Sequence, residues 1–348
     1  MKIGTSLPKN IDVNSITIFH KRKFYKKHDV KVLKRKHVFI SHYGIALKCF
    51  LFVSKTLPNK WGYKKPNGMF GFGFYKKVLE EYFVSKFGKS LSQITLCKNK
   101  KYLFVFSPWF GYFSWITESL PRILMVKEQL ADLILILPES YSKKKFVIES
   151  LSMFPQLKSQ IIPNGVHMMV PKVVIPQLKP WTYEFDPIQM QQFRKFVISF
   201  VEKLNLKMTT PKKIYVSRKK AKNRKLQNET QVLNELELSG FVELEFENYS
   251  FFEQVHLMNN CDLLCGVHGA AFANVCFLKE KSVLFEFIKE YSSYKEERPS
   301  YWRLCSALNI DYYIQYCKPI KYGKYDTWVG IDLIADIAEL KNNLAIIG

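Results

Sequence analysis

The sequence lacks the features that identify several common classes of protein. Its seven cysteines are an odd number and include no Cys-x-x-Cys pair, which argues against a disulfide framework or a zinc finger. No apolar run approaches the ~18 residues of a membrane span, and the N-terminal segment has no apolar core typical of a secretion signal. We therefore expect a cytoplasmic protein with reduced, buried thiols, among them Cys49, Cys265 and Cys276, which at most lies on the cytoplasmic membrane face.

Acidic residues are also scarce, with 30 Asp and Glu against 53 Lys and Arg and a formal net charge of +23. The excess is concentrated in residues 1–66, which contain 16 Lys and Arg but only two Asp. Such a surface attracts anionic lipid, nucleic acid or acidic glycan, although a well-solvated basic face is the simpler interpretation. Because no recognition helix or other nucleic-acid motif accompanies the charge, an anionic membrane surface is the preferred partner.

The length of 348 residues fits two domains, and the apolar pattern predicts the α/β class for both. In the first half, apolar strands at 101–106 and 132–137 flank a helix predicted at 115–130, which is typical of a βαβ unit with a parallel sheet. A helix opened by Asp186 and Pro187 ends before a break at 209–213, where we place the boundary of an N-terminal lobe, residues 1–208.

The second half alternates short strands and short helices more regularly, which predicts a Rossmann-like lobe over residues 209–325. The strands are expected at 213–217, 241–246, 262–266 and 282–287, and the intervening helices at 228–239, from Ser250 onward and at 270–277. A final helix is expected at 332–346.

Polar residues follow three of these strands, where an open parallel sheet binds its ligands. Ser217 and Arg218 come directly after the first strand, and Arg224 follows in the same lysine-rich loop. Arginine offers forked donors and a permanent charge to a diphosphate. The alternative is an ordinary basic surface loop.

The second group is the run 266–274 (GVHGAAFAN). Its small residues Gly269 and Ala270 allow a phosphate to approach the backbone at a helix start, and His268 can donate to a phosphate or a sugar hydroxyl. A tight turn with a packed histidine is the alternative. The third group is Glu286, which ends its strand and suits the two hydroxyls of a ribose, unless it only reaches solvent.

Taken together, the order and spacing of these residues resemble the signature of glycosyltransferase family 61. The matching positions are Ser217, Arg218, Arg224, Asn228, Glu229, Gln254, the run 266–274, Phe277 and Glu286. The segment 115–122 (WITESLPR) is similar to the first-lobe motif of that family. The resemblance covers roughly residues 102–290. One departure is Ser114, which stands where the family usually has a histidine before Trp115. Serine is no general base near neutral pH, so Glu118 becomes the candidate base; a purely structural carboxylate, and an inactive protein, are the alternatives.

The resemblance implies the GT-B fold, with two Rossmann-like lobes facing across a cleft and a last helix (residues 326–348) that packs back toward the first lobe. It implies transfer from a nucleoside-diphosphate sugar to a glycan or lipid-linked glycan in cell-surface or capsule polysaccharide synthesis, with inversion and without a metal or other cofactor. Glu118 and His268 are then catalytic, and Ser114, Trp115 and Arg122 lie on the acceptor side. The donor contacts are Ser217, Arg218, Arg224, Gly269, Ala270, Asn274 and Glu286. A non-catalytic nucleotide-sugar-binding protein and a basic nucleic-acid-binding protein are the alternatives.

Overall fold

The structure, a computed structural model, describes residues 2–10, 19, 23–26, 30–49, 51–53, 72–87, 93–107, 109–177, 184–290, 300–320 and 331–348. Contacts within the chain divide it into two compact units. The terminal unit combines Met1–Lys27 with Phe185–Gly348, and the inserted unit is His28–Glu184. The predicted boundaries at residues 208 and 325 stay predictions.

The terminal unit is built on a six-stranded sheet in the order β12-β11-β13-β14-β15-β16. The strands are β11 (Lys213–Val216), β12 (Phe241–Leu244), β13 (Leu263–Val267), β14 (Val283–Lys289), β15 (Asp311–Pro319) and β16 (Leu333–Ile334). The first five are parallel and only β16 is antiparallel. The predicted Rossmann-like alternation is therefore confirmed as a parallel α/β sheet.

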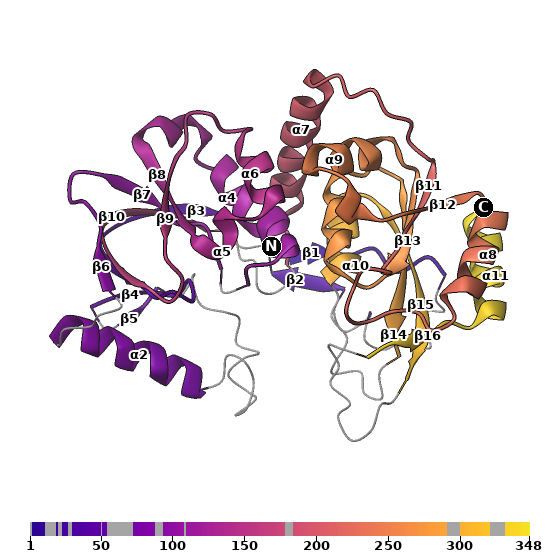
Figure 1. Cartoon of the computed structure of the whole chain (residues 1–348), viewed down its shortest axis with the longest axis horizontal. Helices are drawn as coiled ribbons and strands as arrows, with labels where there is room; N and C mark the ends of the chain where they lie inside the picture. Colours follow the sequence, from indigo (N-terminus) through magenta and orange to yellow (C-terminus); the bar gives the residue numbers. More distant parts are fainter. Residues whose placement is uncertain are drawn as a thin grey trace. The chain divides into compact units, whose positions relative to one another are not determined.

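Helices cover both faces of this sheet (Figure 1). One face carries α8 (Glu229–Leu238) and α11 (Ile337–Ile347), whose apolar side chains join strand residues such as Cys265 and Phe285 in a buried cluster. The other face carries α7 (Pro187–Lys203), α9 (Phe251–Asn260), η7 (Ala270–Phe277) and α10 (Ser300–Ala307). The helix starts predicted at Asp186 and Ser250 are confirmed with their caps. Asp186 accepts from the Gln189 N–H over 3.1 Å, and Ser250 and Glu253 form a reciprocal capping box.

The chain ends meet the sheet at β15. The helix predicted at 332–346 begins only at Ile337, because Asp336 caps it and Leu333–Ile334 pair with β15 instead. At the N-terminus, β1 (Lys2–Gly4) pairs with β2 (Phe24–Lys26). Asn10 then exchanges two hydrogen bonds with the backbone of Ile314, at 2.8 and 3.1 Å.

The inserted unit contains an eight-stranded mixed sheet. Its order is β5-β4-β3-β10-β7-β8-β9, and β6 also pairs with β10. The strands are β3 (Lys31–Ile40), β4 (Ala46–Lys48), β5 (Leu51–Phe52), β6 (Gln93–Thr95), β7 (Lys101–Leu103), β8 (Leu133–Pro138), β9 (Lys158–Ile162) and β10 (His167–Gln177). The parallel pair β7–β8 confirms the predicted βαβ unit. The antiparallel half from β3 to β5 lacks the pattern of a Rossmann-like lobe.

The helix predicted at 115–130 is interrupted. The chain forms α3 (Tyr112–Ser114), a π turn η3 (Trp115–Ser119), α4 (Leu120–Leu124) and then the 3₁₀ helix η4 (Lys127–Asp132). Pro121 has no N–H to donate to a carbonyl one turn earlier, so a regular α-helix cannot run through this position. The π turn closes with the Leu120 N–H on the Trp115 carbonyl, and it carries Glu118.

Cysteine burial follows the prediction in part. Five of the seven free thiols are buried, including Cys265 and Cys276, whereas Cys49 and Cys97 are exposed. The prediction of a buried Cys49 is therefore wrong. The buried apolar residues of this segment are Ala46 and Leu47 of the short strand β4, and Cys49 lies just after that strand ends. In the part of the chain that the structure describes, no helix is long and apolar enough to cross a membrane.

Candidate functional site

The loop after β11 fixes a guanidinium group in place. Arg218 follows the buried Ser217, and it donates from Nε to the Arg224 carbonyl (3.1 Å) and from Nη2 to the Asn223 carbonyl (2.9 Å). Arg224 has a left-handed backbone, with φ of 59°. Burial, followed by the nearby charge of Arg224, lowers the pKa of Arg218 from its ordinary value. Two cations held this close together favour an anionic partner.

The turn after β13 meets that guanidinium directly. A Cβ atom added at Gly269 would overlap Nη1 of Arg218, so the backbone of the turn and the arginine are in contact. The carbonyl of Gly269 accepts from the Tyr301 hydroxyl over 2.5 Å. The structure thus joins two groups that the sequence predicted separately. The close approach of Arg218 is also the reason for a glycine at position 269. The backbone there is extended, with φ of −170°, and would accept any residue.

His268 at the tip of this turn is held by a buried carboxylate. Its Nδ1 contacts Glu286 Oε1, and the Tyr312 hydroxyl donates to Glu286 Oε2 over 2.6 Å. The side chain of Glu286 is 2% exposed and that of His268 is 21% exposed. Glu286 therefore fixes the orientation of the imidazole and leaves Nε2 on the accessible side. The predicted ribose role of Glu286 stays a prediction, and a ribose would have to displace one of these partners.

Asn274 and Gln254 form an internal link between helices. Asn274 is fully buried and donates to Gln254 Oε1 over 2.9 Å, and Gln254 donates to the Phe246 carbonyl over 2.9 Å. This bond holds η7 against α9 beneath the turn. Ala270, in contrast, is exposed at the first residue of η7. A direct contact between Asn274 and the nucleotide-sugar donor stays a prediction. In the structure Asn274 supports the turn from below through its bond to Gln254.

Glu118 lies in the inserted unit and is only 3% exposed. Burial raises its pKa to about 7, against the opposing effects of the Arg122 charge and the Ser107 hydroxyl. Its Oε2 has no hydrogen-bond partner among the residues that the structure describes. A buried carboxyl that titrates near neutrality matches the requirement for a general base.

The other first-lobe motif residues build the framework around Glu118. Trp115 is fully buried and donates from Nε1 to the Ser150 hydroxyl over 2.8 Å. Arg122, also buried, donates from Nη1 to the Val105 carbonyl over 2.6 Å. Ser114 is buried just before the π turn. Their predicted role on the acceptor side stays a prediction.

Sequence reasoning did not identify two tyrosines of the site. Tyr301 packs its ring edge-on to His268, with ring centroids 5.1 Å apart, besides its bond to Gly269. Tyr312 anchors Glu286 from the neighbouring strand β15. The apolar alternation of residues 311–317 could have indicated β15, but nothing in the sequence pairs either tyrosine with the histidine.

Comparison with known proteins places these residues in a family. The family model of glycosyltransferase 61 matches residues 112–285, which is half of the chain. The chain belongs to glycosyltransferase family 61. The matched region contains Glu118, Arg218, Arg224 and His268, and Glu286 is the first residue beyond it.

The curated relatives of this family 61 chain are named EGF domain-specific O-linked N-acetylglucosamine transferases. The rat protein is 28% identical over 143 residues (38% of this chain and 26% of its own length), and the mouse protein is 27% identical over the same coverage. The chicken protein is 27% identical over 103 residues (27% of this chain and 19% of its own length). The chain thus spans about a quarter or less of the relatives it matches.

Proposed function

We propose that this family 61 member transfers a sugar from a nucleoside-diphosphate donor to an acceptor hydroxyl. The observation that carries the proposal is the contact of Arg218 with the Gly269 turn, beside a histidine oriented by Glu286. This arrangement presents fixed positive charge, backbone N–H groups and one oriented imidazole at the carboxyl ends of parallel strands. A departing diphosphate is the ligand that such a site suits.

In the proposed reaction, an acceptor oxygen attacks the anomeric carbon in line with the bond to phosphate. The new glycosidic bond forms as the carbon–oxygen bond to the diphosphate breaks, which inverts the configuration. Glu118 takes the proton of the acceptor hydroxyl. Arg218, Arg224 and the imidazole of His268 stabilise the charge on the departing diphosphate, as a divalent metal does in other transferases.

Two acceptors remain candidates for this site. The resemblance to family 61 favours a glycan, including one on a lipid carrier, in cell-surface polysaccharide synthesis. The relatives named for EGF domains support a hydroxyl on a protein instead. Incubation of the chain with a panel of nucleoside-diphosphate sugars, including N-acetylglucosamine donors, and with both acceptor classes separates the two. Transfer to neither class, without slow donor hydrolysis, would favour a non-catalytic binding protein.

Replacement of Arg218 by alanine is expected to weaken nucleoside-diphosphate binding about 10- to 100-fold, the range for loss of a charge-assisted hydrogen bond. Isothermal titration calorimetry measures this directly. Lys222→Ala is the matched control, because Lys222 is an exposed cation in the same loop and its loss should change affinity less than about threefold. Equal effects of the two substitutions would mean that only the net charge of the loop matters.

The basic surface of β3 supports a proposal of peripheral binding to anionic membrane. Lys34, Arg35 and Lys36 are exposed there, and Lys172 of β10 is exposed opposite Lys36. Each such charge contributes roughly 1 kcal/mol near an anionic bilayer. The double substitution Lys34→Glu/Lys36→Glu changes two exposed cations on the same side of β3 and should reduce sedimentation with phosphatidylserine liposomes at least about tenfold. Reversal of the exposed pair Lys203 and Lys207 is the control; an equal loss would indicate nonspecific attraction.

A further inference from the structure

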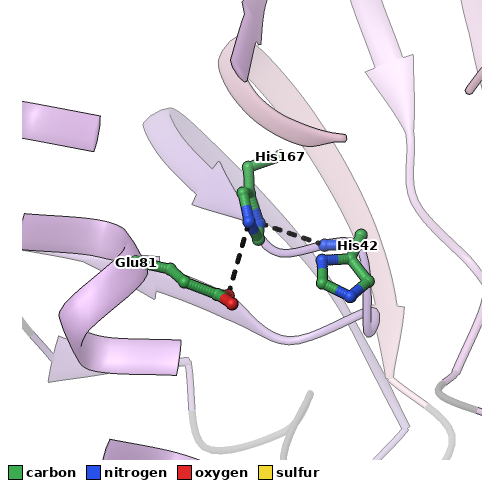
Figure 2. Close-up of side chains that lie close together, drawn as sticks. All are labelled: His42, Glu81 and His167. Atoms are coloured by element: carbon green, nitrogen blue, oxygen red, sulfur yellow. Dashed lines mark hydrogen bonds and ion pairs between the residues drawn. The ribbon is translucent and has the colours of Figure 1, made fainter. Parts of the chain in front are cut away.

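Three potential metal ligands from separate parts of the inserted unit meet at one point. His42 follows β3, Glu81 lies on α2 (Phe72–Phe87) and His167 begins β10. Their nearest ligand atoms all lie within 4.8 Å of one another. Figure 2 shows Glu81 reaching from its helix toward His167, with the ring of His42 beside them. None of these residues belongs to the site described above.

Two of the three side chains have buried polar atoms that lack an internal hydrogen-bond partner. Nδ1 of His42 and Oε2 of Glu81 accept or donate no hydrogen bond within the part of the chain that the structure describes. Glu81 Oε2 lies 3.4 Å from Nε2 of His167. Buried polar groups are nearly always satisfied, and one that is not often indicates a missing ion or water.

The spacing and the donor types fit a transition metal. Tetrahedral zinc with bonds of roughly 2.0–2.2 Å holds its ligand atoms about 3.4 Å apart, which the His167–Glu81 pair already matches. The remaining gap closes with side-chain movements of about 1 Å. Two imidazoles and one carboxylate are a common donor set for zinc and similar divalent ions, with water in the open position.

The surroundings keep both imidazoles in the ligand form. Burial lowers the pKa of His42 to about 4, helped by His167 and Lys77, and burial with Lys77 also lowers the pKa of His167. Both rings are therefore neutral at about pH 7 and have a lone pair to share. Ring contacts fix their positions: His42 packs on Tyr43 at 3.7 Å between centroids, and His167 stacks on Phe39 at 5.5 Å.

We infer that His42, Glu81 and His167 bind one divalent transition ion of the zinc type, which clips α2 to the sheet of the inserted unit. The helix already packs Val78 and Tyr82 into a small apolar cluster with Phe39. A metal bond between α2 and the strands adds a directional tie to that contact. The exposed ammonium of Lys77 opposes the cation, so its removal strengthens binding. The inference does not depend on glycosyl transfer.

Zinc titration of the full chain by calorimetry tests this site. The background carries Cys49→Ser and Cys97→Ser, which remove the exposed thiols. We expect one Zn²⁺ per chain, at least about tenfold weaker binding in His42→Gln and in Glu81→Gln, and severalfold tighter binding in Lys77→Gln. The control His37→Asn changes an exposed histidine of β3 and keeps a residue type that tolerates its φ of 53°; it should bind like the parent.

The gain expected from Lys77→Gln keeps the test decisive if a ligand variant folds poorly, since that substitution removes no buried group. The raised melting temperature of the parent with added Zn²⁺, and its reversal by a chelator, provide a second measurement. Absence of stoichiometric binding in the parent overturns the inference. Binding that is unchanged in His42→Gln and Glu81→Gln does so as well.

Discussion

Replacement of Glu118 by glutamine should reduce sugar transfer by about 10²- to 10⁴-fold, the usual contribution of a general base. Nucleoside-diphosphate binding should stay unchanged, because Glu118 lies in the inserted unit and the arginine–histidine group lies in the terminal unit. Initial rates with saturating donor, together with calorimetry of the nucleotide, measure both quantities. Full turnover in Glu118→Gln would move the role of base to His268.

The same substitution should change the pH dependence of stability. Burial raises the pKa of Glu118 from 4.5 to about 7 in the folded chain, so folding favours the protonated carboxyl. The resulting stability is complete below about pH 4.5 and is lost as the pH rises through about 7, by up to about 3 kcal/mol. A glutamine side chain cannot ionise, so Glu118→Gln should melt at a higher temperature than the parent at about pH 8.5 and at the same temperature at about pH 4.5. The two roles of Glu118 can then be told apart. Both predict the change in melting temperature, but only a catalytic Glu118 predicts that Glu118→Gln also loses sugar transfer.

Replacement of Gly269 by alanine should weaken nucleoside-diphosphate binding about 10- to 100-fold while the chain stays folded. The new methyl group overlaps Nη1 of Arg218, and the guanidinium is the movable partner, so it leaves its position at the turn. The loss equals that of a charge-assisted contact. Gly111→Ala is the control, because a Cβ there meets nothing within 4 Å. Calorimetry and circular dichroism report binding and folding.

A double substitution distinguishes displacement of Arg218 from general damage to the turn. If Gly269→Ala acts by moving the guanidinium, Gly269→Ala/Arg218→Ala should bind no worse than Arg218→Ala alone. In the Arg218→Ala background, Gly269→Ala would then have almost no further effect on nucleoside-diphosphate binding. Additive losses would show that the backbone of the turn itself had been distorted.

Local sequence signals predicted the elements of the terminal unit well. The capping box at Ser250 and the cap at Asp186 act over a few residues, so they are readable without tertiary structure. The prediction erred where partners far along the chain decide the conformation. Leu333–Ile334 were expected to be helical, yet they pair with β15, and the apolar patterns of a helix and of a short strand look alike at that length.

Most residues of the candidate site were predictable from the sequence, but Tyr301 and Tyr312 were not, and the roles of the predicted residues were less clear. The spacing after strands identified Arg218 and His268, because the ends of parallel strands converge. Glu286 was expected to end its strand, but it lies inside β14, which continues to Lys289. The spacing could not reveal that both carboxylate oxygens of Glu286 are bonded, one to His268 and one to Tyr312, since these contacts depend on the register of β14 with β13 and β15. Nor could it reveal the π turn that carries Glu118 or the burial that raises the pKa of that carboxyl.

The bonds between Asn10 and Ile314 join residues that are 304 positions apart, and this separation sets an order of events during translation. At about 5–20 residues per second, the ribosome makes β15 roughly 15–60 s after Asn10. The inserted unit, whose residues are complete long before that, is free to fold first. Asn10 therefore has no partner in β15 until the whole inserted unit has been synthesised, and the terminal unit is completed only after that.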